Sequence, residues 1–160
     1  MDKKEKGKPP VAFLLAQVGA HAAMKFGERL KTLQLTPPDA GILRMLSHSS
    51  GLSQQELSGR LKIHPSRLVA ILDELENQGL VERKPQPDDR RQYALHLTPK
   101  GSDVLSQIGK VAREHMEDIC STLSANERDT LGDLLRRIAD QQGLTPGVHP
   151  GYSHLKPGRK

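Results

Sequence analysis

The chain has 160 residues, with 24 lysines and arginines against 19 aspartates and glutamates and a formal net charge of +5 at pH 7. Its length fits one ordinary domain, and an aromatic content of 2% means that the core must be aliphatic. The basic balance favours a polyanionic partner, although many basic proteins bind nothing in particular. The single cysteine excludes an intrachain disulfide, as suits a reducing cytoplasm. Because no signal peptide and no long apolar run is found, we expect no membrane span.

The two ends of the chain are basic and lack helical periodicity. Residues 1–8 are lysine-rich and expected to be disordered, and residues 144–160 are rich in proline and glycine. We expect residues 144–160 to form a flexible basic tail that packs on a partner chain or remains mobile. Solvation is the simpler role for both ends, and weak phosphate contact is the alternative.

Two helices are predicted before the central part of the chain. The first covers residues 11–33, and its apolar stripe comprises Leu14, Val18, Ala22, Phe26 and Leu30. The second begins after Thr36, where Asp39 three residues later completes a capping-box pattern. The core side of this helix comprises Ile42, Leu43 and Leu46, and Gly51 follows its end.

A third and a fourth helix follow, with a very short connection between them. Ser53 and Glu56 form another capping-box pattern, and Pro65 suits the first turn of the next helix because it has no amide to leave unpaired there. The connection over residues 62–64 is too short for a linker and brings the two helices into contact. A helix-turn-helix uses such a turn to place its second helix in the major groove of DNA.

The fourth helix has an apolar face and a polar face. The apolar stripe, most simply core, comprises Leu68, Ile71, Leu72 and Leu75. The polar face begins with small residues such as Ser66 and Ala70, which let a backbone lie close to base edges. It ends with Asp73, Glu74 and Glu76, so we expect its second half to point away from phosphates. An ordinary solvated helix face is the alternative.

A β-hairpin follows the fourth helix. Gly79 suits a left-handed helix end, and residues 80–83 and 93–97 alternate as two strands. One face of the second strand carries Tyr93, Leu95 and Leu97. Arginines at the tip of such a ribbon can enter a minor groove, and a neighbouring carboxylate can fix one of them through a bidentate pair. The alternative is an exposed hairpin whose surface ion pair contributes little energy.

These elements and motifs resemble the MarR family of bacterial transcriptional regulators. The wing signature of that family, Asp-x-Arg and then, after three residues, Leu-x-Leu-Thr, is found here over residues 89–98. The preceding helix opens with Pro65-Ser66 and is followed by Gly79-Leu80-Val81, which also fits. The similarity runs from about residue 11 to residue 143 and is most specific between residues 53 and 101. Glu74 departs from the pattern, because many relatives carry a basic residue there.

The resemblance implies a mainly helical single domain with a small β-hairpin wing. It would comprise a winged helix-turn-helix over residues 36–101 and long terminal helices over residues 11–33 and 102–143 that form a dimerisation region. Its recognition helices would enter major grooves, and Arg91, oriented by Asp89, would enter the minor groove. The expected DNA contacts are Ser53, Gln54 and Gln55 before the recognition helix; His64, Pro65, Ser66, Arg67, Val69 and Ala70 on it; and Arg83, Lys84, Asp89, Arg90 and Arg91 of the wing.

Two further helices are predicted after the wing. One begins after Thr98 and runs to about Leu123, and the other opens with a capping box at Ser124 and Glu127. Their apolar residues in helical register are Val104, Ile108, Val111, Ala112 and Ile119, then Leu131, Leu134, Leu135 and Ile138. Because the winged module has its own core, these stripes need another partner, which a second copy supplies in a two-fold interface. Two-fold symmetry predicts a pseudo-palindromic operator with half-site centres about 34 Å apart.

No catalytic pattern is found, so we expect neither an enzyme nor a cofactor. The sequence has no Gly-rich phosphate loop, no nucleophile elbow and no His pair with a supporting Glu. A zinc site built from His21, Glu114 and His115 is an alternative to ordinary surface residues. We expect Cys120 to act as a small hydrophobic residue, and a redox sensor is the alternative.

The resemblance also implies a small-molecule effector, often an aromatic acid or another lipophilic compound. It would bind between the dimerisation helices and the winged module. The candidate residues are His21, Lys25 and Arg44 as polar groups, with Met24 and Met45 as an apolar wall. Ordinary packing or a surface position is the alternative for each.

We therefore expect a cytoplasmic, nucleoid-associated homodimer that binds double-stranded DNA sequence-specifically and regulates transcription, usually as a repressor. An effector would release it by changing the separation or tilt of the recognition helices. One rival is a sequence-tolerant architectural DNA-binding protein, which the basic charge allows. A second is a protein-interaction module that has lost DNA binding, which the acidic half of the fourth helix favours. A third is a redox-responsive regulator that acts through Cys120.

Overall fold

The computed structural model describes residues 7–157, and the outer parts of both basic ends lie outside this range. The helices and strands follow in the order α1 (Val11–Leu30), the 3-10 turn η1 (Lys31–Leu33), α2 (Pro37–His48), α3 (Gln54–Leu61), α4 (Pro65–Asn77), β1 (Val81–Pro85), β2 (Tyr93–Leu97), α5 (Pro99–Ile119), α6 (Ala125–Gln141) and the 3-10 turn η2 (Pro150–His154). This mainly helical fold with a two-stranded wing is the predicted one.

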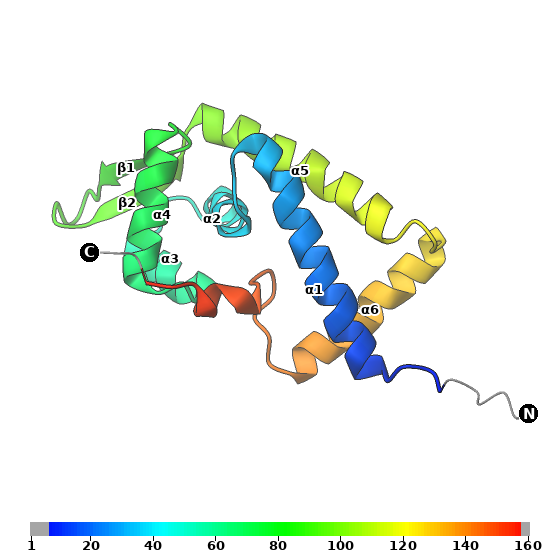
Figure 1. Ribbon diagram of the computed structural model, residues 1–160. Coiled ribbons are helices and arrows are strands. Elements are labelled where there is room, and N and C mark those ends of the chain that lie inside the picture. The colour runs from blue at the N-terminus through cyan, green and yellow to red at the C-terminus, as the bar shows by residue number, and fades with distance from the viewer. Residues whose placement is uncertain (1–6, 158–160) are drawn as a thin grey trace, which may run out of the picture.

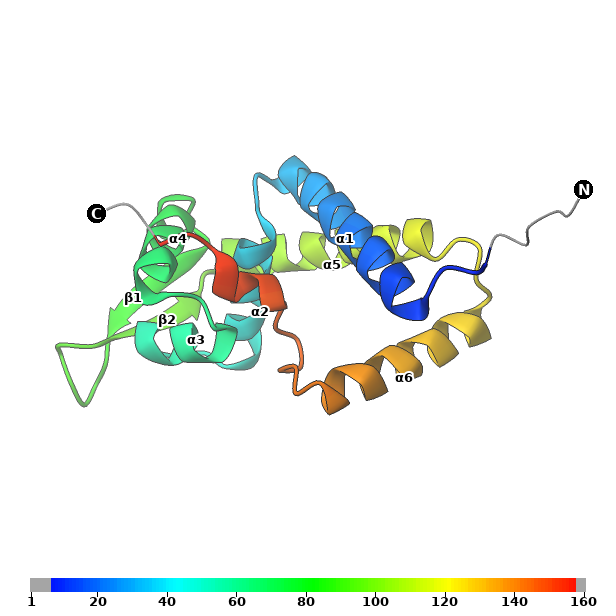
Figure 2. The same cartoon turned by 60° about the horizontal axis from the view of Figure 1, so that its bottom comes forward.

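The elements fall into two regions of the molecule. Helices α2, α3 and α4 gather with the two strands at one end, and the hairpin projects outward from them (Figure 1). The long helices α1, α5 and α6 extend to the other end, where α1 packs along α5 (Figures 1 and 2). No helix of the described residues is long and apolar enough to cross a membrane.

The hydrophobic core lies in the winged module. Its most deeply buried side chains, each 0–1% exposed, include Leu43, Leu46, Leu57, Leu68, Leu72, Leu75 and Leu95. All four predicted stripe residues of α4 are buried, as are the three predicted for α2. Helix α1 adds only Leu30 to the buried set, and α6 adds no residue of its described length. The core therefore fixes α4, whereas the long helices keep much apolar surface exposed.

Helix α2 begins where the sequence predicts. The Asp39 carboxylate accepts hydrogen bonds from the backbone amide of Thr36 at 2.7 Å and from its hydroxyl at 2.8 Å. Burial raises the pKa of Asp39, although these hydrogen bonds act in the opposite direction.

The wing is an antiparallel pair in which Val81 lies opposite Leu97 and Pro85 opposite Tyr93. Leu52 extends the sheet, because the Leu95 amide donates to its carbonyl at 2.9 Å. Leu95 is fully buried, Leu97 is half-buried and Tyr93 is 50% exposed. Tyr93 is therefore not covered as Leu95 is, because it lies at the end of the strand toward the hairpin tip.

Two glycines allow the wing to join its flanking helices. Gly79 follows the end of α4 with a φ of +73°, a conformation that residues other than glycine rarely adopt. Gly101 lies in the first turn of α5, where a Cβ atom would be only 2.1 Å from the carbonyl oxygen of Leu80. A side chain at position 101 would therefore push α5 away from the base of the wing.

The segment after α6 differs from the flexible tail expected for residues 144–160. Its described part, residues 144–157, turns back and packs beside α2 (Figure 2). Tyr152 is 9% exposed, and its hydroxyl donates to the Pro37 carbonyl at 3.1 Å. Gly41 leaves space for it, since a Cβ atom there would lie 2.6 Å from that hydroxyl. We call residues 145–155 the C-terminal strap.

Candidate nucleic-acid interface

Local hydrogen bonds fix both the start of α3 and the turn between α3 and α4. The Glu56 amide donates to the Ser53 hydroxyl at 3.1 Å, and the Ser53 amide donates to the Glu56 carboxylate at 2.8 Å. These bonds lower the pKa of Glu56 and confirm the predicted capping box. Lys62 then adopts a left-handed conformation with a φ of 55°, and the buried Ser58 hydroxyl donates to the Ile63 carbonyl at 2.6 Å. The connection is therefore rigid as well as short.

The first half of α4 presents small and polar groups to solvent. His64 caps the helix, with its Nδ1 accepting from the Ser66 amide at 3.3 Å. Of the residues expected to contact DNA here, Ser66 and Arg67 are half-buried and the exposed ones are His64, Pro65, Val69 and Ala70. Because the opposite face of α4 is buried in the core, the expected DNA-contact residues share one outward surface.

At the wing tip, Asp89 bonds to the backbone of Arg91, whereas a pair with the arginine side chain was expected. The Asp89 carboxylate accepts a hydrogen bond from the backbone amide of Arg91 at 2.9 Å, and the Gln92 amide donates to the Asp89 carbonyl at 3.0 Å. Asp89 therefore shapes the turn, as aspartate side chains do in turns, and does not clamp the guanidinium. Arg90 and Arg91 are both exposed, and neither forms an ion pair within residues 7–157.

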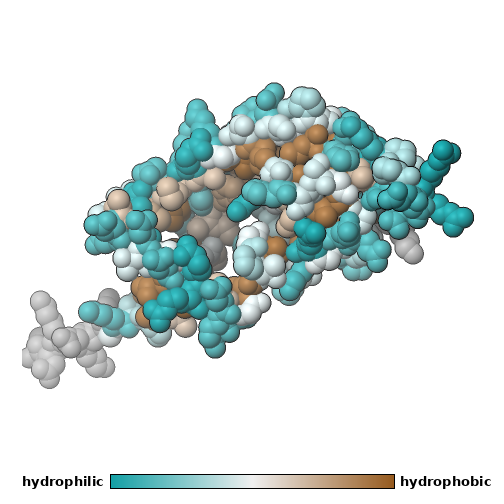
Figure 3. Space-filling model, turned by 180° about the vertical axis from the view of Figure 1, so that it is seen from behind, coloured by the Kyte–Doolittle hydropathy of each residue, from teal (hydrophilic) through white to brown (hydrophobic). Residues whose placement is uncertain are grey.

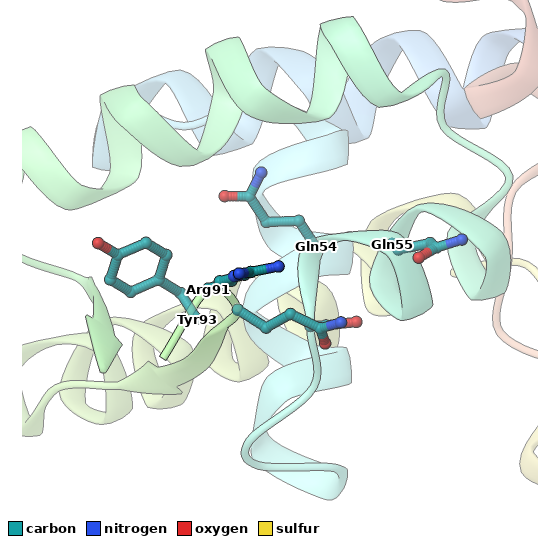
Figure 4. A pocket seen from close by; sticks show the side chains of 6 residues that line it. Gln54, Gln55, Arg91 and Tyr93 are labelled. Atoms are coloured by element: carbon teal, nitrogen blue, oxygen red, sulfur yellow. The ribbon is translucent and has the colours of Figure 1, made fainter. Parts of the chain in front are cut away.

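A cleft joins the start of α3 to the wing (Figure 4). It has a volume of about 240 Å³ and is lined by Ser53, Gln54, Gln55, Arg91, Gln92 and Tyr93. Figure 4 shows Gln54 and Gln55 at the beginning of α3, with Arg91 and Tyr93 coming from the wing. Two groups of expected DNA contacts, separate in sequence, thus lie together. A guanidinium beside a helix N-terminus and two side-chain amides suits hydrogen bonding to the anionic backbone of DNA.

The two basic residues of β1 have different surroundings. Lys84 is exposed and pairs with Glu82 at 2.9 Å. Arg83 is only 17% exposed, and its guanidinium bonds to Gln54, Asp73 and Glu76 instead of pointing to solvent. Reasoning from the sequence missed this cluster, because its four members come from three elements. The second half of α4 is acidic and was expected to lie away from phosphates. Two of its acids, Asp73 and Glu76, pair with Arg83 of the wing.

The five residues proposed for an effector site do not come together. Arg44 lines a cavity of about 410 Å³ between α1, α2 and α5, and Met45 lines a smaller groove beside it. His21, Met24 and Lys25 line neither cavity, and Lys25 lies 3.8 Å from Glu28. The walls of the 410 Å³ cavity include the apolar Phe26, Leu105 and Ile108 together with Arg44, His48 and Tyr152. The last of these comes from the strap, which sequence reasoning left out.

Candidate metal and redox residues are scattered. Among residues 7–157, no three His, Cys, Asp or Glu side chains form a group that could hold a metal ion. The His115 ring lies 5.4 Å from that of Phe26, and burial together with the charge of Arg29 lowers the pKa of His115. Cys120 is a free, half-buried thiol at the end of α5.

Comparisons of the sequence with known proteins agree on one family. A model of the MarR family matches residues 33–92. The chain is 32% identical over 160 residues to a putative transcriptional regulatory protein for the hcr operon of Thauera aromatica, covering 90% of this chain and 96% of that one. It is 30% identical over 129 residues to the HTH-type transcriptional repressor Rv2887 of Mycobacterium tuberculosis, covering 81% and 93%.

Solved structures show the same fold. Wild-type apo MarR from E. coli superposes with a TM-score of 0.74 at 25% identity, covering 83% of this chain and 98% of that one. The repressor CouR, bound to a 23-mer DNA duplex, gives 0.72 at 32% identity and covers 81% and 92%. The Rv2887 complex with DNA gives 0.71 at 28% identity and covers 82% and 98%. The chain therefore belongs to the MarR family of DNA-binding transcriptional regulators.

Proposed function

We propose that the protein is a homodimeric repressor that reads a pseudo-palindromic operator. In this proposal, the first half of α4 enters the major groove, and Arg91 enters the neighbouring minor groove. The observation that carries it is the cleft shared by the start of α3 and the wing tip, with Arg91 exposed beside Gln54 and Gln55. Lys84 and Arg90 then lie at the wing as phosphate contacts. Such a regulator acts on the chromosome, in the cytoplasm.

The apolar surface of the long helices supports the dimer. Large hydrophobic side chains of α1 and α6 are exposed by 38% or more, namely Val11, Phe13, Leu14, Leu15 and Val18, with Leu131, Leu134, Leu135 and Ile138. Val11 and Leu15 line a groove together with all four of these apolar α6 residues. Figure 3 shows brown apolar side chains around a hollow on this side of the molecule. Monomeric proteins rarely leave so large an apolar patch in water, and a second copy would cover it symmetrically.

We also propose that an effector occupies the cavity between α1, α2 and α5. Its volume of about 410 Å³ lies within the range usual for small-molecule sites. An aromatic acid would place its ring against Phe26 and Ile108 and its carboxylate near Arg44. Because the walls come from both regions of the molecule, a bound ligand would alter the tilt of α4 relative to the long helices, and the two recognition helices would no longer fit their grooves at once.

Selection from random DNA tests the proposal. The protein is incubated with duplexes that carry a randomised segment, and the bound duplexes are amplified and sequenced. A two-fold related pair of half-sites is the expected product, and an enriched pool without a shared motif would replace the regulator with a sequence-tolerant binder. Light scattering of the eluted complex gives the stoichiometry, expected to be two chains per duplex.

A further inference from the structure

Arg83 occupies a position that links three elements of the DNA-binding surface. It lies on β1 opposite Leu95, and its Nε donates to the side-chain oxygen of Gln54 at 3.1 Å. One terminal nitrogen donates to Asp73 at 2.7 Å, and the other donates to Glu76. Gln54 begins α3, and the two acids lie one turn apart on α4. One side chain of the wing thus holds both helices of the helix-turn-helix.

The chemistry of this cluster suits arginine alone. A guanidinium presents donors in a fixed planar fork, so its bonds to three partners fix their relative directions. A lysine ammonium would keep the charge but not that geometry. The Arg83 side chain is 17% exposed, against 58% for Asp73 and 43% for Glu76. The cation is thus sheltered, and its bonds compete less with water than those of an exposed pair.

The cluster also reduces the net negative charge at the surface of α4. Asp73 and Glu76 are on the recognition helix itself, where unpaired carboxylates would repel a phosphate backbone. Arg83, which lies on β1, offsets part of the negative charge of these two carboxylates. Its guanidinium is directed to α4 and α3, whereas those of Arg90 and Arg91 are without an acidic partner in the described chain. The arginines of the wing therefore have two different jobs.

We propose that Arg83 is a positioning residue for DNA reading: it sets the angle between the recognition helix and the wing and offsets part of the negative charge of α4, without contacting DNA. The inference rests on the proposed function, because major-groove and minor-groove contacts must be made together for the angle to matter. A wing that moved freely relative to α4 would still bind phosphates. It would no longer make the major-groove and minor-groove contacts at the same time, and its preference for the operator would therefore fall.

The first test compares Arg83→Gln with Lys84→Ala. Affinities for the selected operator and for a scrambled duplex are measured by fluorescence anisotropy over a range of salt concentrations. Arg83→Gln is expected to lower the operator-to-scrambled ratio about tenfold, equivalent to about 1.4 kcal/mol, with an unchanged salt slope. Lys84→Ala, a loss of a phosphate contact, should weaken both duplexes alike and reduce the slope by about one. If Arg83→Gln gives the Lys84 pattern, or no effect, the positioning role is refuted.

The second test leaves Arg83 in place and removes its partners. The double variant Asp73→Asn, Glu76→Gln adds two units of positive charge relative to the parent, so simple electrostatics predicts tighter binding to every duplex. The positioning role predicts a lower operator-to-scrambled ratio in spite of that charge. In the background of the double variant, Arg83→Gln should change the ratio little, because the ion pairs with α4 are already lost and only the hydrogen bond to Gln54 remains. A full additional tenfold loss there would contradict the proposal.

A third variant, Arg83→Lys, tests the proposal even if Arg83→Gln folds poorly. It keeps the charge and a long side chain but not the fork, so the ratio should fall while the melting temperature changes little. A Lys variant with the parent's ratio would show that charge alone suffices and would overturn the positioning role. The parent protein separates this result from a failure of the proposed function, because a parent without operator preference would refute that function before any variant is compared.

Discussion

Arg91 has the exposed side chain on which minor-groove reading depends. Its neighbours in the cleft are the polar residues at the start of α3, and its backbone is held by Asp89. We expect Arg91→Ala to weaken operator binding about ten- to a hundredfold at fixed salt, since such a contact contributes about 1–3 kcal/mol. The melting temperature should stay unchanged because the side chain is exposed. Anisotropy titrations and a thermal melt give both values.

Two neighbouring residues serve as controls for Arg91. Arg90→Ala should weaken operator and scrambled duplexes alike, because its contact is with phosphate. Asp89→Ala should cause a smaller loss than Arg91→Ala, since it loosens the turn but also removes a negative charge near phosphates. An Arg91→Ala protein that binds the operator as tightly as the parent would show that the wing is not a minor-groove reader.

His115 makes folding depend on pH. Burial and Arg29 lower its pKa from the usual 6.5, so the unfolded chain takes up a proton more readily than the folded one. The stability that the neutral ring provides is complete above pH 6.5 and is lost as the pH falls below that value. We expect the melting temperature of the parent to fall more between pH 8 and pH 5.5 than that of His115→Gln, by a few degrees. The exposed His154→Gln variant should follow the parent, and if His115→Gln did so too, the histidine would have no such role.

At the scale of the elements, the strap gives the clearest stability prediction. Tyr152→Ala removes a buried ring from the surface of α2 and should lower the free energy of unfolding by about 3 kcal/mol. Tyr152→Phe removes only the hydrogen bond to the Pro37 carbonyl and should cost about 1 kcal/mol. Tyr93→Ala, at a half-exposed position, is the control and should change stability little. Equal unfolding curves for the parent and Tyr152→Ala would mean that the strap is not docked in solution.

The elements that sequence reasoning found are those whose signals are local. A capping box at Ser53 or Ser124 needs only residues three positions apart, and both helices begin there. The strap was missed because its order depends on Gly41 and Pro37, more than a hundred residues away. The Arg83 cluster was missed for the same physical reason, since spacing along the chain does not reveal which acids face a strand. The Asp89 contact was found as a pair, but its partner is the backbone of Arg91.

For the whole molecule, the apolar face of α6 predicts assembly. Leu135 is 41% exposed in the single chain, and in a dimer it would be covered. Leu135→Asp should therefore dissociate or unfold the protein, because an unpaired charge cannot be buried. Arg136→Ala, in a strongly exposed ion pair with Asp133, should leave the dimer intact. Sedimentation equilibrium at micromolar concentration decides this, and a monomeric parent protein would contradict the dimer.

The central claim is that two copies place their recognition helices in successive major grooves of one operator. Hydroxyl-radical footprinting of the parent protein on its selected operator tests this most directly. We predict two protected half-sites, related by two-fold symmetry and centred about one helical turn apart, with protection in the flanking minor grooves that Arg91→Ala removes. Continuous protection that grows with protein concentration, or a single protected half-site at saturation, would contradict the account.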